Sequence, residues 1–481
     1  MKISKQPISL WTGTAFLFGV IGLLGVVAWL SPNEPIDLGF AQLRMPRIAD
    51  LVSAGPSVEI SADERMETVE AEMVLTAADS ARMALADTLA LYQDFFASSE
   101  TSIKFPNEDY TYLFRSFRAM EQAGQSANRV AHVLHYGDSQ IEGDRISCLL
   151  RDSLQALFGG GGPGLLPLLQ PISARSVGQT LTDTVPMYYA GGIMGRRADH
   201  KRYGALAQMA ELNTDSLTMG ISARRVGGFR RLMLYVGHTA DSLVARVGDN
   251  EQRAEANTEA LQILTWPLTN SREVQMTLKG KADIYGVEVD GGRGVTLTNI
   301  PMRGADGFFL NNPDGLLMAD MMRSLGVELI LLEFGGNALP MISDTAQVTR
   351  YVRGLGKTIE RVRSMSPKTP MILIGPADMS VTVDGTLQTH PMLPDLTAKM
   401  RQMCNDHNLA FWDMYAVMGG RNSMLAWVSH QPAWAGGDYV HFTPRGADRI
   451  ASILWRALSM NYDYMKLTER YETEHGTRAN E

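Results

Sequence analysis

Cysteine is almost absent from this sequence, which has only Cys148 and Cys404 among its 481 residues. The fold therefore needs no disulfide framework. Each cysteine falls in a segment with helical periodicity, where we expect it to be a small buried apolar residue. No C-x-x-C or H-x-x-x-H spacing occurs, so no metal site is predicted, and no motif calls for a cofactor.

An excess of positive charge is also missing. The formal net charge is −8 and no basic stripe occurs, which argues against nucleic acid as the main partner. A glycine run follows Phe158, but it lacks the Gly-Lys-Ser/Thr ending of a phosphate-binding loop. We expect a flexible loop there, near the mouth of an active site.

Charged residues are absent from Pro7 to Leu30, a run long enough to cross a bilayer as a helix. Lys2 and Lys5 precede it, and positive charge favours the cytoplasmic side. Residues 1–31 are therefore predicted to be a cytoplasmic N-terminus and a transmembrane helix. The chain would be a single-pass protein of a bacterial inner membrane, with the rest in the periplasm. A cleaved signal peptide is the alternative, and it gives the same compartment.

Residues 32–60 are rich in proline and glycine and are predicted to be a linker. Glycine and proline are then absent from Ser61 to Ser98, where apolar residues recur at roughly helical spacing. We interpret 61–125 as a helical region that forms a stalk or packs on a catalytic domain. A coiled-coil stalk is the alternative, although the heptads are irregular.

The segment 300–465 alternates apolar strands with amphipathic helices. This order predicts an α/β fold, a parallel sheet with helices on both faces. Active sites in such sheets lie beyond the carboxyl ends of the strands. Residues 466–481 form a polar tail.

A candidate nucleophile lies where such a strand ends. The apolar run from Val130 to Tyr136 predicts a buried strand, and Gly137, Asp138 and Ser139 follow it directly. Helical spacing resumes after Ser139, so its hydroxyl is expected at the opening of a helix, where developing negative charge is favoured. Alternatively, Asp138 and Ser139 are only turn and cap residues.

A second motif lies near the C-terminus. Asp438 and His441 form a D-x-x-H sequence, and Thr443 and Pro444 look like the N-cap and first residue of a helix. G-D-S and D-x-x-H, in this order at opposite ends of an α/β pattern, resemble the SGNH/GDSL hydrolases, serine esterases and acyltransferases.

The resemblance implies a flavodoxin-like, three-layer catalytic domain in two parts, 126–213 and 300–465. It implies that Ser139 attacks, that His441 accepts its proton and that Asp438 orients the imidazole. The oxyanion hole would consist of the Ser139 and Gly304 backbone N–H groups and the Asn337 side chain. Gly304 lies in M-R-G-A-D-G and Asn337 in G-G-N-A, which match the family's second and third blocks.

Between the two parts, residues 214–299 contain short strand-like segments separated by glycine, aspartate and asparagine turns. This spacing favours an inserted β-sandwich. In its position it resembles the carbohydrate-binding-type module of some membrane-anchored peptidoglycan O-acetylesterases of the family.

We therefore expect a serine esterase that removes O-acetyl groups from a cell-wall or surface polysaccharide, with peptidoglycan favoured. An O-acetyltransferase that uses the same acyl-serine is the first alternative. A non-catalytic polysaccharide-binding protein is the second. The expected partners are the acetylated glycan and the inner membrane, and a membrane acyltransferase is a further candidate.

Overall fold

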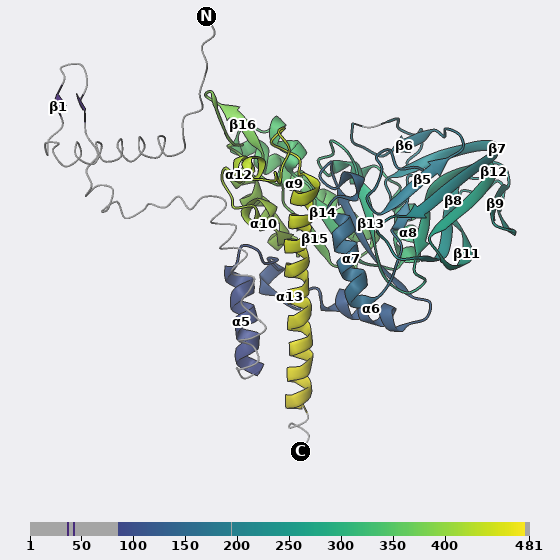
Figure 1. Cartoon of the computed structure of the whole chain (residues 1–481), viewed down its shortest axis with the longest axis horizontal. Helices are drawn as coiled ribbons and strands as arrows, with labels where there is room; N and C mark the ends of the chain where they lie inside the picture. The colour runs from purple at the N-terminus through teal and green to yellow at the C-terminus, as the bar shows by residue number, and fades with distance from the viewer. Residues whose placement is uncertain (1–35, 38–41, 44–84, 194, 477–481) are drawn as a thin grey trace, which may run out of the picture. The chain divides into compact units, whose positions relative to one another are not determined.

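The computed structural model describes residues 36–37, 42–43, 85–193 and 195–476 (Figure 1). The chain divides into two compact units, residues 1–61 and 62–481. Of the first, the structure describes a hairpin of β1 (Ile36–Asp37) and β2 (Gln42–Leu43). The predicted transmembrane helix lies outside the described residues. Within the described ranges, no helix has the length and apolar character that a membrane crossing requires.

A five-stranded parallel sheet forms the centre of the second unit. Its strands, in spatial order, are β13 (Gly294–Pro301), β3 (Val130–Gly137), β14 (Val327–Glu333), β15 (Met371–Ile374) and β18 (Ala410–Trp412). Gly137 is in register with Pro301 on one side and with Glu333 on the other. Three carboxyl ends therefore meet at one edge, where the fold places active sites.

Helices cover both faces of this sheet, as Figure 1 shows. Along β3 the face alternates: Val133 belongs to one buried apolar cluster and Leu134 to the other. The first cluster includes α6 (Phe114–Gln125), α7 (Ser147–Phe158) and α13 (Pro444–Gly476). The second includes α8 (Gly315–Leu325), α9 (Thr345–Met365) and α10 (Leu393–Asp406). The predicted three-layer α/β arrangement is confirmed.

Of the predicted helical region 61–125, the structure describes residues from 85 onward. Its first helix there is α5 (Leu85–Ser98), whose Phe96 packs edge-on against Tyr464 of α13, with ring centroids 5.5 Å apart. In the described part, this region packs on the catalytic domain. The remaining short elements are η1 (Pro106–Glu108), η2 (Glu142–Asp144), η3 (Phe308–Asn311), η4 (Gly336–Met341), β16 (Ser380–Val383), β17 (Thr386–Thr389), α11 (Met414–Val417) and α12 (Ser423–Ser429).

A nine-stranded antiparallel sheet, called the inserted sheet below, occupies residues 164–290. It has its own apolar cluster. Its strands are β4 (Gly164–Leu166), β5 (Val177–Leu181), β6 (Met187–Tyr189), β7 (Gln208–Ala223), β8 (Phe229–Gly237), β9 (Leu243–Val247), β10 (Asn250–Ala254), β11 (Gln262–Ser271) and β12 (Glu273–Asp290). All nine are linked by hydrogen bonds, so a sandwich of two separate sheets stays a prediction.

The inserted strands differ in extent from the predicted segment 214–299. They begin at Gly164, and the segment's last residues belong to β13, which pairs with β3 in the parallel sheet. β13 is buried on both faces, and its alternation of apolar residues with Thr296 and Thr298 is typical of a strand in either kind of sheet.

The glycine run after Phe158 is not the flexible loop expected from the sequence, because it packs between the two sheets. Gly160 forms a β-bridge with Val295, and a Cβ on Gly162 would lie 2.3 Å from the Val289 carbonyl oxygen. Because they lack a Cβ, these glycines can lie close to the backbones of β12 and β13.

Candidate active site

Ser139 lies just beyond the carboxyl end of β3. Gly137, the last residue of that strand, accepts a hydrogen bond from Met302 N–H through its carbonyl, at 2.9 Å. A Cβ on Gly137 would lie 2.9 Å from Ile141 Cδ1 and 3.3 Å from Glu333 Cβ, so the tight packing here requires glycine. The chain then turns sharply and exposes the serine hydroxyl beyond the edge of the sheet.

The prediction that Ser139 opens a helix is wrong. A turn and η2 follow it, and α7 begins only at Ser147. Gly143 and Asp144 have φ values of 67° and 65°, which interrupt helical geometry between the serine and α7. Any stabilisation of negative charge on Ser139 must therefore come from nearby N–H groups rather than from the dipole of α7.

The structure brings the three predicted catalytic side chains together. Ser139 Oγ lies 2.8 Å from His441 Nε2, and His441 Nδ1 lies 2.8 Å from Asp438 Oδ2. The D-x-x-H turn is itself closed by backbone N–H groups, because His441 N and Val440 N both donate to Asp438 Oδ1. Thr443 caps α13 through its hydroxyl, as the sequence predicts.

Asp438 is held as a carboxylate. Burial raises its pKa, but hydrogen bonds from the His441 side chain, His441 N–H and Val440 N–H outweigh that effect and bring the pKa below its ordinary value. The side chains of His441 and Asp438 are 35% and 53% exposed. Asp438 can therefore hold the imidazole and stabilise its cation at neutral pH, in a site that water reaches.

Gln140 fixes the loop that carries His441, a role that the sequence analysis missed. Its amide nitrogen donates to the Val440 carbonyl at 2.6 Å, and its carbonyl accepts from Phe442 N–H at 3.3 Å. Arg145 adds to this connection by donating to the carbonyls of Phe442 and Ser139. Gln140, the residue after the nucleophile, thus forms hydrogen bonds with both chain neighbours of His441.

Asn337 lies on η4, just after β14, and its amide already has partners. It donates to Asp138 Oδ2 at 2.7 Å and to the Ala305 carbonyl at 3.1 Å. Asn337 therefore ties the nucleophile turn to the loop after β13. To donate to an oxyanion, it must share or release one of these bonds.

Asp138 itself is a buried carboxyl group. Burial, helped by the charge of Glu333, raises its pKa to about 7 in spite of the hydrogen bonds from Gln140 N–H and Asn337. Beside Asp138 lies a buried pair formed by Glu333 and His135, with Glu333 Oε2 3.2 Å from His135 Nε2. The other ring nitrogen of His135, Nδ1, lies 2.8 Å from Ser147 Oγ. His135 is thus a structural residue beneath the site.

Gly304 lies in a tight turn after β13, closed by the bond from Ala305 N–H to the Met302 carbonyl. Its φ of 71° suits glycine, and a Cβ would lie 2.8 Å from Ile193 Cγ2. Within the described part of the chain, the N–H groups of Ser139 and Gly304 donate to no other residue. Both are available to an oxyanion.

A cleft of about 580 Å³ opens at Ser139 and His441. Its lining combines these two side chains with Asp138 and Asn337 and with the apolar residues Pro340, Pro376, Met379 and Val440. In the portion of the chain that the structure describes, no group of three or more histidine, cysteine, aspartate or glutamate residues is arranged to hold a metal. The chemistry of the cleft rests on the serine, the imidazole and the amide groups.

No protein-family model and no curated protein matches the chain. A solved structure of a peptidoglycan O-acetylesterase superposes with a TM-score of 0.58 at 21% identity, over 72% of this chain and 95% of that one. A family two carbohydrate esterase from Cellvibrio japonicus gives a TM-score of 0.25 at 10% identity, over 60% of this chain and 99% of that one. An acetyl xylan esterase gives a TM-score of 0.26 at 17% identity, over 34% of this chain and 81% of that one. The first of these superpositions shows that this chain shares the fold of that esterase, in which the candidate site lies at the carboxyl ends of the parallel strands.

Proposed function

We propose that this protein is a serine esterase that removes O-acetyl groups from a polysaccharide, with peptidoglycan as the favoured substrate. The observation that carries the proposal is the chain of short contacts from Ser139 through His441 to Asp438 at the edge of the parallel sheet. The fold shared with a peptidoglycan O-acetylesterase supports the choice of substrate.

In the first half of the reaction, His441 Nε2 takes the Ser139 proton while Oγ attacks the acetyl carbonyl carbon. Asp438 stabilises the resulting imidazolium. The carbonyl oxygen becomes an oxyanion, which the N–H groups of Ser139 and Gly304 and the Asn337 amide are proposed to bind. When the tetrahedral intermediate collapses, the bond to the sugar oxygen breaks and the imidazolium returns its proton to that oxygen.

In the second half, a water molecule attacks the acetyl-serine. His441 accepts a proton from the water, a second tetrahedral intermediate forms, and its collapse releases acetate and restores the Ser139 hydroxyl. Water has ready access, because the side chains of His441 and Asp438 are both partly exposed. This access favours hydrolysis over transfer of the acetyl group to another sugar.

The proposal includes the cellular setting. The uncharged run from Pro7 to Leu30 and the two lysines before it support an inner-membrane anchor. The catalytic unit would then face the periplasm, where peptidoglycan lies.

The test is acetate release from O-acetylated peptidoglycan by the full chain. Ser139→Ala should lose activity by on the order of 10⁴-fold or more, because the nucleophile is gone. Ser452→Ala, an exposed serine on α13, is the matched control and should keep full activity. Undiminished acetate release by a folded Ser139→Ala protein refutes the mechanism, and transfer of acetyl to added glycan without acetate release refutes hydrolysis.

A further inference from the structure

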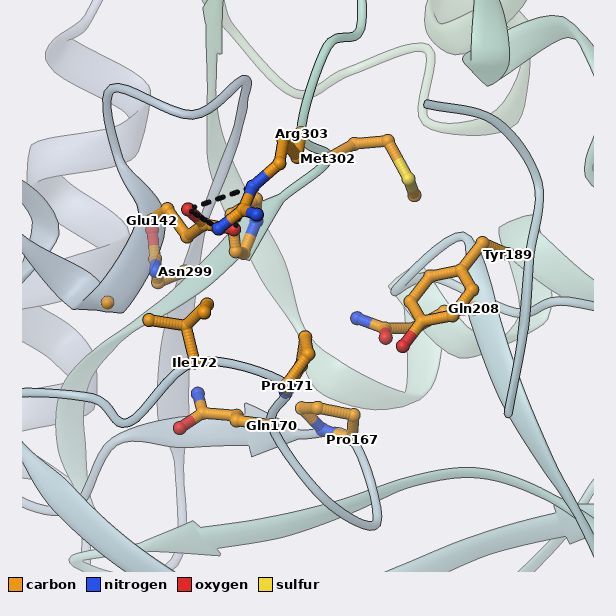
Figure 2. A pocket seen from close by; sticks show the side chains of 12 residues that line it. Glu142, Pro167, Gln170, Pro171, Ile172, Tyr189, Gln208, Asn299, Met302 and Arg303 are labelled. Carbon is orange, nitrogen blue, oxygen red and sulfur yellow. Dashed lines mark hydrogen bonds and ion pairs between the residues drawn. The ribbon is translucent and has the colours of Figure 1, made fainter. Parts of the chain in front are cut away.

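A second pocket lies beside the catalytic cleft, between the inserted sheet and the loops of the parallel sheet (Figure 2). Its empty space, counted together with the solvent open to it, is about 510 Å³. Glu142 and Arg303 come from the catalytic side, from η2 after Ser139 and from the turn before Gly304. Tyr189 and Gln208 come from β6 and β7 of the inserted sheet. The pocket therefore adjoins both loops of the proposed oxyanion hole.

Gln208 is the unusual residue of this pocket. It is 4% exposed, and its Oε1 has no hydrogen-bond partner among the described residues. An unpaired polar atom in the interior costs free energy, which a bound partner that orders the Gln208 amide would offset. Gln208 is the cross-strand neighbour of Tyr189, and Figure 2 shows both side chains directed into the pocket, across from Ile172.

The charges in the pocket are already neutralised. Arg303 donates to both carboxylate oxygens of Glu142, with Nε 3.1 Å from Oε1 and Nη2 2.6 Å from Oε2. A phosphate or carboxylate ligand would have to compete with this two-pronged ion pair. The pocket is thus suited to an uncharged ligand.

The rest of the lining is largely apolar, with Gln170 and Asn299 as its other polar side chains. Pro167, Pro171, Ile172, Met302 and the Tyr189 ring line the pocket together with Gln208. A complementary ligand must be neutral, must carry a donor or acceptor for a carboxamide, and must have an apolar part. An acetamido group meets all three conditions, because its C=O can accept a hydrogen bond from the Gln208 amide nitrogen, which Figure 2 shows directed into the pocket, while its methyl group lies against the walls.

We propose that this pocket binds the N-acetyl group of an amino-sugar residue in the glycan, next to the residue whose acetyl ester is cleaved. This inference rests on the proposed function for the position of the ester, but the binding itself is independent of catalysis. It assigns to Gln208 the selection of N-acetylated glycans over neutral glycans that lack the acetamido group.

The experiment is calorimetric titration of the full chain with tetra-N-acetylchitotetraose and with cellotetraose, which has the same backbone without acetamido groups. Neither probe carries an acetyl ester, so binding is measured without turnover. The chitotetraose should bind at least about tenfold more tightly, as expected for one or two additional hydrogen bonds. Gln208→Leu should remove this preference, whereas Gln275→Leu, at an exposed position on β12, should keep it.

A second variant tests the pocket independently, in case Gln208→Leu does not fold. Ile172→Trp, at the partly exposed rim, should fill the pocket and weaken chitotetraose binding by a similar factor. Equal affinity for the two tetramers, no binding of either, or full affinity in both pocket variants overturns the inference. The Ser139→Ala protein should bind chitotetraose normally, so loss of the proposed esterase activity and loss of this subsite are separate results.

Discussion

At the scale of single residues, Asn337 has two partners that compete with its proposed role. As an oxyanion donor it should bind the tetrahedral state more strongly than the ground state. Asn337→Ala should then lower kcat by roughly 10²–10³-fold with little change in KM. Steady-state kinetics on a small acetyl ester measures this, with Asn213→Ala at an exposed position as the control.

The structure adds a second expected effect of Asn337→Ala. Removing the amide leaves the buried Asp138 without one of its donors, so the free energy of unfolding should fall by about 1–3 kcal/mol. A destabilised enzyme with unchanged kcat would show that Asn337 only ties the two loops together. The oxyanion would then depend on the N–H groups of Ser139 and Gly304.

Asp138 gives a prediction about pH. Burial raises its pKa to about 7, whereas its ordinary value is 3.8. Between these two pH values the folded state keeps a proton that the unfolded state releases, so the free energy of unfolding falls as pH rises. A difference of about three pKa units corresponds to a loss of at most about 4 kcal/mol between pH 4 and pH 7.

Asp138→Asn should remove this dependence, because an amide does not titrate. Chemical denaturation of both proteins at several pH values between 4 and 7 measures the difference. The exposed Asp320→Asn on α8 serves as the control and should behave as the unmodified chain does. Parallel stability curves for Asp138→Asn and the unmodified chain would contradict a raised pKa at this position.

At the scale of elements, the sequence predicts helices and turns well where residues close in the sequence determine their structure. The helix α9 (Thr345–Met365) is one of the amphipathic helices expected between 300 and 465, because its apolar stripe is regular and Asp344 caps it by accepting from Gln347 N–H. The D-x-x-H turn is likewise local, since backbone N–H groups within the motif close it on Asp438. Ser139, His441 and Asp438 could therefore be proposed before the structure was known.

Elements that depend on distant partners could not be placed in this way. Helical spacing continues from Ile141, but α7 starts at Ser147 because Asp144 pairs with the buried Arg151 and Gly143 accepts from Arg175 N–H. Gln140 carries no local signal, since its partner Val440 lies 300 positions further along the chain.

At the scale of the whole described unit, the two sheets share one interior. His132 of β3 and Glu288 of β12 are 2.8 Å apart, and both side chains are 0% exposed. The Tyr235 hydroxyl donates to the same glutamate at 2.7 Å. Because these groups join the parallel sheet to the inserted sheet, we expect the described part of this unit to unfold as a whole rather than sheet by sheet.

This coupling is tested by Glu288→Leu, which leaves His132 and the Tyr235 hydroxyl buried without their shared partner. Leaving a buried polar group without its partner costs about 1–3 kcal/mol, so the midpoint of thermal unfolding should fall markedly. Glu273→Leu, at an exposed position on the same strand, is the control and should change the midpoint little. Calorimetry should show one main transition in all three proteins, lowered as a whole in Glu288→Leu. If instead the variant melts in two steps, with esterase activity surviving the first, the inserted sheet is an independent domain, and its contact with β3 contributes little to the stability of the catalytic fold.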